Sequence, residues 1–92
     1  MIVSDALQVS VISPERVLFE GAALSVIAPS FDGELGILSM HAPLMTLLGR
    51  GTLRVATSDG ERRFSVDGGF LQVVDNQVRV VTERAEAIGA VA

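Results

Sequence analysis

The chain has 92 residues, enough for one hydrophobic core but hardly for two, so a single domain over residues 1–92 is expected. A net charge of −4, from 11 acidic residues against 7 arginines, and an aromatic content of 4% argue against nucleic-acid binding. The absence of cysteine excludes disulfides and thiolate metal sites. No apolar run approaches the roughly 18 residues of a membrane span, and the start lacks the basic flank of a secretory signal, so a soluble protein is expected.

The first half of the chain alternates apolar and polar residues with a period of two, which is typical of strands with one buried face. Strands are predicted at residues 7–12, 17–19, 24–28, 37–38 and 44–48. Pro14, Gly21, Pro29 and Gly49 mark their ends, because proline removes a backbone donor and glycine permits a turn.

The second half of the chain predicts two hairpins. The first joins residues 53–57 to 64–66 through a turn at 58–60; after a break at Gly68-Gly69, the second joins 70–74 to 78–83 through 75–77. Short strands at close intervals predict an all-β fold, a flattened antiparallel sandwich or barrel of about eight to ten strands. Residues 84–92 are expected to form a short tail, because they are too few for an independent helix.

Some strands carry apolar residues on both faces, as in Val73 with Val74 and Val80 with Val81. Such doubled positions have two explanations. The strands that carry them are either central strands of a compact core, or strands whose outer face is covered by another element or subunit. The alternation leaves both open.

An acidic glycine-containing segment and the only histidine lie within a dozen residues, in DGELGILSMHAP. His41 with Asp32 or Glu34 could act in acid–base chemistry, which leaves a hydrolase as one hypothesis. Against it, the chain has no GxSxG serine and no cysteine, and a single histidine does not supply a usual zinc site. The favoured interpretation is a rigid contact loop, because Pro43 restricts the backbone before it and loops on a sandwich concentrate binding function.

The Asp-Gly-Glu sequence occurs twice, at Asp32-Gly33-Glu34 and at Asp59-Gly60-Glu61. Both fit tight turns, in which aspartate supplies a side-chain hydrogen bond and glycine a positive φ. Calcium loops need many more oxygens at fixed offsets. No catalytic, cofactor-binding or metal-binding residue is therefore expected.

The order LQVSVISPERVLFEG, DGELGILSMHAPLMTLL, GRGTLRV and VDGGFLQVVDNQVRVVTE resembles the epsilon subunit of F-type ATP synthase, in its N-terminal β-sandwich domain. The resemblance runs from about Leu7 to Glu83. Its most specific part is GELGIL followed by HAPL, a hairpin and GGFLQV in this order and spacing. Ser39-Met40 departs from the pattern, because the family more often has a Pro-Gly turn before the histidine.

The resemblance implies a non-catalytic rotor subunit of the central stalk, which couples c-ring rotation to the catalytic head through the gamma subunit and the c-ring. It implies a peripheral position on the cytoplasmic face of the bacterial plasma membrane, with no cofactor and no small-molecule substrate. It places Asp32, Gly33, Glu34, Leu35, His41 and Pro43 at the c-ring and Ser13, Met45 and Thr46 at the gamma subunit.

The C-terminal pair of helices usual in that family has no counterpart after Ala92. The resemblance therefore implies that this chain lacks their activities, inhibition of ATP hydrolysis and, in some members, ATP binding. A naturally short chain and a truncated one are both consistent with this. The runner-up hypothesis is a small ligand-binding sandwich that uses the loop around His41 as its pocket.

Overall fold

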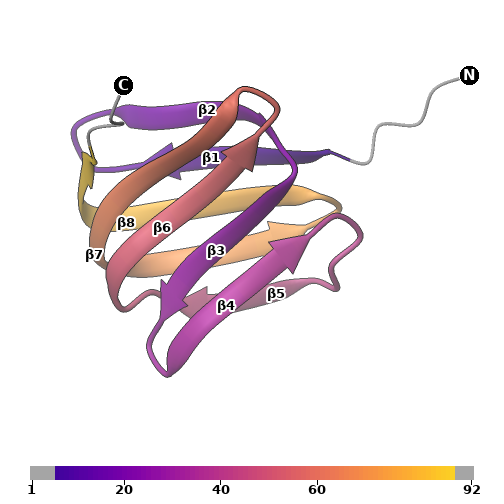
Figure 1. The fold of residues 1–92 in the computed structure, drawn as a ribbon. Helices are drawn as coiled ribbons and strands as arrows, with labels where there is room; N and C mark the ends of the chain where they lie inside the picture. The colour runs from indigo at the N-terminus through magenta and orange to yellow at the C-terminus, as the bar shows by residue number, and fades with distance from the viewer. Residues whose placement is uncertain (1–5, 89–92) are drawn as a thin grey trace, which may run out of the picture.

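The computed structural model describes residues 6–88, which form eight β-strands and no helix (Figure 1). The strands are β1 (Leu7–Ile12), β2 (Val17–Ala23), β3 (Ser25–Ser30), β4 (Gly33–Leu38), β5 (Leu44–Leu47), β6 (Arg50–Thr57), β7 (Gly60–Val74) and β8 (Gln77–Ala87). The predicted all-β class is confirmed. No helix of these residues is long and apolar enough to cross a membrane. The start of the chain up to residue 5 and residues 89–92 of the expected tail lie outside the described residues.

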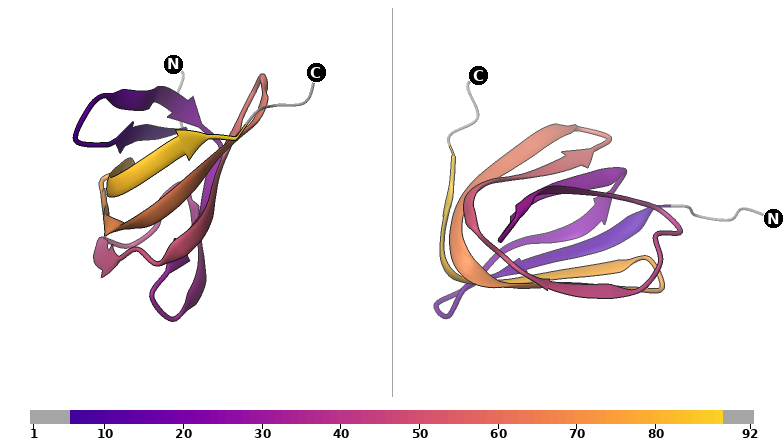
Figure 2. Two further views of the ribbon diagram at one scale, coloured as in Figure 1. Left: turned by 90° about the vertical axis from the view of Figure 1, so that its left-hand side faces the viewer. Right: turned by 90° about the horizontal axis from the view of Figure 1, so that it is seen from below.

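The strands are hydrogen-bonded in the order β2-β1-β8-β7-β6-β3-β4, and β5 pairs with the second half of β7. Strand β7 has 15 residues and belongs to both layers of the sandwich. Its first half continues the layer of β6, β3 and β4, and its second half lies between β8 and β5 in the layer that also holds β1 and β2 (Figures 1 and 2). One continuous strand therefore connects the two layers.

Alternate residues of both layers point into the space between them and form the core. The largest fully buried side chains are Leu7, Val9, Val11, Val26, Ile37, Leu53, Val55, Phe64, Val66, Leu71, Val73 and Val78. The doubled apolar positions divide between the two faces. Val73 and Val80 are buried, whereas Val74 is exposed and Val81 only half-buried. The second member of each pair therefore lies on the outer surface.

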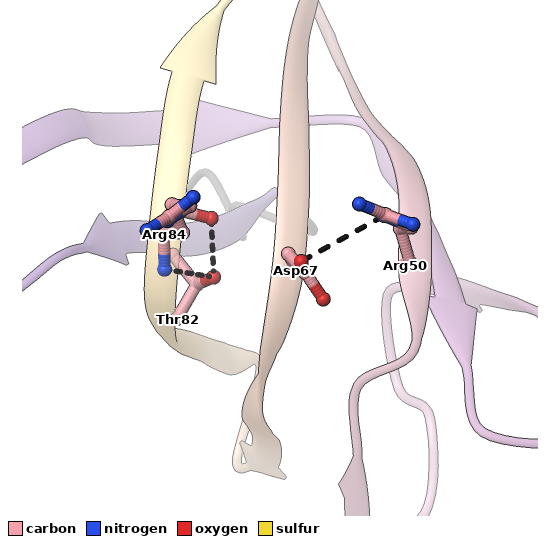
Figure 3. Close-up of polar contacts among 4 residues, drawn as sticks. All are labelled: Arg50, Asp67, Thr82 and Arg84. Atoms are coloured by element: carbon pink, nitrogen blue, oxygen red, sulfur yellow. Dashed lines mark hydrogen bonds and ion pairs between the residues drawn. The ribbon is translucent and has the colours of Figure 1, made fainter.

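The predicted break at Gly68-Gly69 is wrong, because β7 continues through both glycines and bends there. Their φ angles are 79° and 106°, and a Cβ at Gly69 would collide with the carbonyl oxygen of Val81 on the neighbouring strand. On β8 the buried Thr82 hydroxyl donates to the carbonyl of Arg84 at 2.9 Å and accepts from its N–H at 3.3 Å (Figure 3). The glycines thus bend the strand where it passes between layers, rather than ending it.

Several predicted strand ends also differ from the structure. Strand β2 passes Gly21, and β3 passes Pro29, which breaks no bond of the β3–β6 ladder because that ladder ends at Ile27. Strand β4 begins at Gly33 rather than at residue 37, so most of the acidic segment is strand. Residues 84–87 belong to β8 rather than to a tail, because they pair with the first half of β7.

One pairing departs from an antiparallel sandwich. Strands β1 and β8 run parallel, from Gln8 opposite Gln77 to Ile12 opposite Val81. Both strands have one buried face. The alternation of apolar and polar residues indicates which face is buried, but not whether a strand runs parallel or antiparallel to its neighbour. The parallel pair joins the start of the chain to its end and brings Ile12 and Val81 side by side.

Candidate interaction surfaces

The acidic segment and the histidine lie at opposite ends of β4. Asp32 directly precedes the strand and His41 follows its last residue, Leu38, by three positions. A strand of this length spans roughly 17 Å. The structure therefore does not bring His41 together with Asp32 or Glu34, and the hydrolase hypothesis loses the carboxylate–imidazole pair on which it depended.

The loop that carries His41 is held by several hydrogen bonds. The ring Nδ1 lies 2.7 Å from the carbonyl oxygen of Ala42, and the backbone N–H of His41 donates to the carbonyl of Leu38 at 3.2 Å. Met40, at φ 68°, donates its N–H to Oδ1 of Asn76 at 2.6 Å, in the β7–β8 turn. A residue other than glycine thus occupies this left-handed position. The histidine side chain is half-buried and engaged within its own loop.

The β3–β4 turn projects from the sandwich and is held rigidly. The hydroxyl of Ser30 donates to the carbonyl of Gly33 at 2.6 Å and lies 3.0 Å from Oδ1 of Asp32. The N–H of Phe31 donates to the carbonyl of Leu47 on β5 at 3.2 Å. Asp32, Gly33 and Glu34 are exposed, and so is Phe31, at 69%. These four exposed residues, 31–34, are called the acidic tip below.

Leu35, which the resemblance placed with the acidic residues, turns the other way. Its side chain is half-buried and packs against the hydrophobic core. Phe31 was not selected from the sequence, although an aromatic residue directly before a predicted turn, outside the predicted strands, has no evident place in the core. That mismatch between residue type and position is the signal that could have found it.

An apolar row crosses the outer face of the layer that holds β5. Cross-strand neighbours bring together Ile12 on β1, Val81 on β8, Phe70 on β7 and Leu47 on β5. These four residues are called the apolar row. Leu47 is 63% exposed and the other three are half-buried. Together with Pro14, the first three line a shallow depression whose surface is mainly apolar.

Two of the three residues placed at the gamma subunit border this row. Ser13 directly follows Ile12 and lines the same depression, and Met45, which is 64% exposed, shares the outer face of β5 with Leu47. Thr46 points to the opposite side, because it lies across from the fully buried Leu71.

The outer face of the other layer carries the two ion pairs found within residues 6–88, together with the exposed Leu38 of β4. The Nε atom of Arg50 lies 3.7 Å from Oδ2 of Asp67, and Arg84 lies across from Asp67 on the next strand (Figure 3). Arg63 pairs with Glu61 at 2.7 Å along the same strand. The two outer faces therefore differ, because one carries a row of neighbouring apolar side chains and the other carries ion pairs.

Within residues 6–88, no group of three or more histidine, cysteine, aspartate or glutamate side chains is arranged to hold a metal ion. The described residues thus form a small β-scaffold with an apolar row on one outer face and a projecting acidic tip, an architecture that commonly carries binding surfaces. Comparison with known families makes the assignment specific. Residues 6–88 match the family described as ATP synthase, Delta/Epsilon chain, beta-sandwich domain, and the chain belongs to this family.

Two similar curated proteins are both named ATP synthase epsilon chain. The ATP synthase epsilon chain of Syntrophomonas wolfei is 46% identical over 77 residues, which are 83% of this chain and 56% of the relative. That of Solibacter usitatus is 46% identical over 87 residues, 91% of this chain and 65% of the relative. The chain thus spans less than two thirds of the length of these relatives. The predicted resemblance is confirmed over the β-sandwich domain.

Solved structures show the same fold. A chain of the Euglena gracilis mitochondrial ATP synthase, solved as OSCP/F1/c-ring, superposes with a TM-score of 0.84 at 20% identity over 95% of this chain and 56% of that chain. A chain of the Tetrahymena thermophila central stalk and c-ring gives a TM-score of 0.75 at 17% identity over 87% of this chain and 65% of that chain. At these identities the likeness supports the fold.

Proposed function

We propose that this chain is a non-catalytic component of the rotor of an F-type ATP synthase, which passes rotation between the c-ring and the catalytic head. The observation that carries the proposal is the apolar row on the outer face of a sandwich that belongs to the epsilon family. A torque-bearing domain needs a stiff body and docking surfaces large enough not to slip, on the order of 1,200 Å² or more for a stable complex.

The apolar row is the proposed docking surface for the gamma subunit. Leu47 and Met45 expose apolar side chains that the core does not need, and burying them on a partner would be favourable. Ser13 borders the same surface, but it is buried and its hydroxyl donates to the carbonyl of Arg16 at 3.2 Å, so it would shape the edge of the surface rather than bond to the partner. Thr46, which points inward, would support this surface by packing below it rather than by contact.

The acidic tip is the proposed contact with the c-ring. Asp32 and Glu34 project from a turn whose backbone is fixed, so they can meet polar or basic loops without much loss of conformational freedom. Charge complementarity of this kind sets register more than affinity. His41 and Pro43, which the resemblance also places at the c-ring, lie at the other end of β4 and would contact the ring separately from the acidic tip.

In this role the chain is peripheral to the membrane, held on its cytoplasmic face through the complex, and has no substrate of its own. The test is association. The purified chain is mixed with the gamma subunit and the detergent-solubilised c-ring of the same ATP synthase and analysed by size-exclusion chromatography. Co-elution with both partners is expected, whereas binding to neither would reject the proposal.

A further inference from the structure

Two hairpin turns of this chain share the sequence Asp-Gly-Glu and one hydrogen bond, from the hydroxyl of a preceding residue to the glycine carbonyl. In the β3–β4 turn the Ser30 hydroxyl donates to the carbonyl of Gly33 at 2.6 Å, and in the β6–β7 turn the Thr57 hydroxyl donates to the carbonyl of Gly60 at 2.8 Å. Both glycines have positive φ, 137° and 123°. Asp-Gly-Glu occupies the same positions in both. Each turn is therefore an internal control for the other.

The two turns differ in the residue before the aspartate, which is Phe31 in one and Ser58 in the other. The same geometry forms with serine at this position, so the turn does not require the aromatic ring. The core does not require the ring either, because Phe31 is 69% exposed. The ring is therefore free to contact a partner, and aromatic residues, phenylalanine included, are enriched at protein interfaces.

The backbone under Phe31 is fixed on both sides. Its own N–H donates to the carbonyl of Leu47 at 3.2 Å, Ser30 forms a bridge with Leu48, and the N–H of Gly49 donates to the carbonyl of Pro29 at 2.9 Å. A Cβ at Gly49 would lie 2.8 Å from the carbonyl oxygen of Ser30, so the two segments touch there. A contact made by a ring on so rigid a base loses little conformational entropy on binding.

Among the described residues, the carboxylates beside Phe31 have no cation of their own. The ion pairs found within residues 6–88 join Arg50 to Asp67 and Arg63 to Glu61. The glutamate of the second turn is thus neutralised by a neighbour, whereas Glu34 and Asp32 of the acidic tip are not. A guanidinium group is the partner that suits both features, because it stacks on an aromatic face and donates paired hydrogen bonds to a carboxylate.

We infer that Phe31 is the aromatic anchor of the c-ring contact and receives an arginine side chain from a polar loop of the ring. The guanidinium lies on the phenyl ring while Asp32 or Glu34 accepts its hydrogen bonds. This inference rests on the proposed c-ring contact and adds to it the residue that holds the contact and the chemistry of the partner. Binding to the gamma subunit does not involve this tip.

The experiment measures the affinity of the purified chain for detergent-solubilised c-rings and, separately, for the gamma subunit. Phe31→Ser gives the tip the residue of the second turn and is expected to weaken c-ring binding about tenfold or more. Phe31→Tyr keeps the ring and is expected to bind like the original chain. Ser58→Phe is the matched control and should not strengthen c-ring binding. All three variants should bind the gamma subunit unchanged.

Unchanged c-ring affinity of Phe31→Ser would overturn the anchor role while leaving the c-ring contact itself in place. If the original chain bound the gamma subunit but no c-ring, the contact and the inference would both be wrong. The partner chemistry is tested with c-rings whose arginines have been modified by phenylglyoxal. The original chain should lose its advantage over Phe31→Ser on these rings, and a retained advantage would rule out the guanidinium.

Discussion

The guanidinium of Arg50 on β6 and the carboxylate of Asp67 on β7 form an ion pair of 3.7 Å at a position where Arg84 stands across from Asp67 on the other side (Figure 3). The acid therefore separates two like charges on neighbouring strands. Both members of the pair are well exposed, at 84% and 51% of their side-chain surface. Water and salt screen such pairs strongly.

We expect Asp67→Asn to lower the free energy of unfolding by less than about 1 kcal/mol, and less still at high salt. Urea denaturation at low and high ionic strength measures the difference. Asp59→Asn, which removes the same charge at an exposed turn, is the control. A loss of several kcal/mol would show instead that the charges of Arg50, Asp67 and Arg84 help to stabilise the bend in β7.

The bend in β7 depends on Gly69. Gly69→Ala should lower the free energy of unfolding by about 3 kcal/mol or more, because the new methyl group meets the carbonyl of Val81 at a φ of 106°. Gly36→Ala is the matched control, since no heavy atom lies within 4 Å of the added Cβ. Its effect should stay within about 0.5 kcal/mol. Equal stabilities of the two variants in chemical denaturation would contradict this account of the bend.

Arg62 covers an aromatic pair at the edge of the core. Its guanidinium carbon lies 5.4 Å from the ring centre of Phe19 and 5.9 Å from that of Phe64. Arg62→Ala should therefore cost about 1 kcal/mol of stability, through the lost cation–π contacts and the cover of the rings. Arg54→Ala, on the outer face of β6, controls for the removal of a positive charge. Thermal unfolding in which both variants melted together would argue against a contribution from the rings.

Asn76 stabilises the loop that carries His41 from a distance in sequence. Asn76→Gly keeps a residue suited to φ 63° but removes the acceptor for the N–H of Met40. The expected loss is about 1 kcal/mol, together with faster hydrogen exchange at the Met40 amide. Gln77→Ala, one position along the chain, is the control. Unchanged exchange at Met40 would mean that other contacts hold the loop.

The two outer faces can be distinguished by substitutions of matched exposure. Leu47→Glu introduces a charge into the apolar row and should reduce binding to the gamma subunit at least about tenfold. Leu38→Glu, at 65% exposure against 63% for Leu47, lies on the outer side of the other layer and should leave that binding unchanged. Surface plasmon resonance measures both. Equal losses would point to a nonspecific effect of charge, and no loss from Leu47→Glu would place the gamma contact elsewhere.

The sequence predicted the strands whose alternation reflects a single buried face, such as Leu7–Ile12 with Leu7, Val9 and Val11 inward. The predictions from sequence were wrong where one residue type is compatible with two different local structures. Gly68-Gly69 has the composition of a chain break, yet a glycine pair also allows a strand to bend between layers. Pro29 looked like a strand end, but it lies beyond the last pair of the β3–β6 ladder.

The candidate surfaces were harder to predict than the strands. The acidic segment was recognised, but its separation from His41 depends on the direction and length of β4, which residue types alone do not give. The apolar row could not be read from the chain, because Ile12, Phe70 and Val81 become neighbours only through long-range pairing, part of it parallel. Phe31 differs from these, because an aromatic side chain directly before a predicted turn and outside the predicted strands is a signal that the sequence itself contains.

The bridge between the β3–β4 turn and the end of β5 also has a mechanical consequence. Phe31 is bonded to Leu47, and β5 is bonded along its length to the second half of β7. A sideways push on the turn is therefore passed to β5 and, through its hydrogen bonds, to the long strand that belongs to both layers. Such a domain would yield little under load and would transmit displacement with small elastic loss.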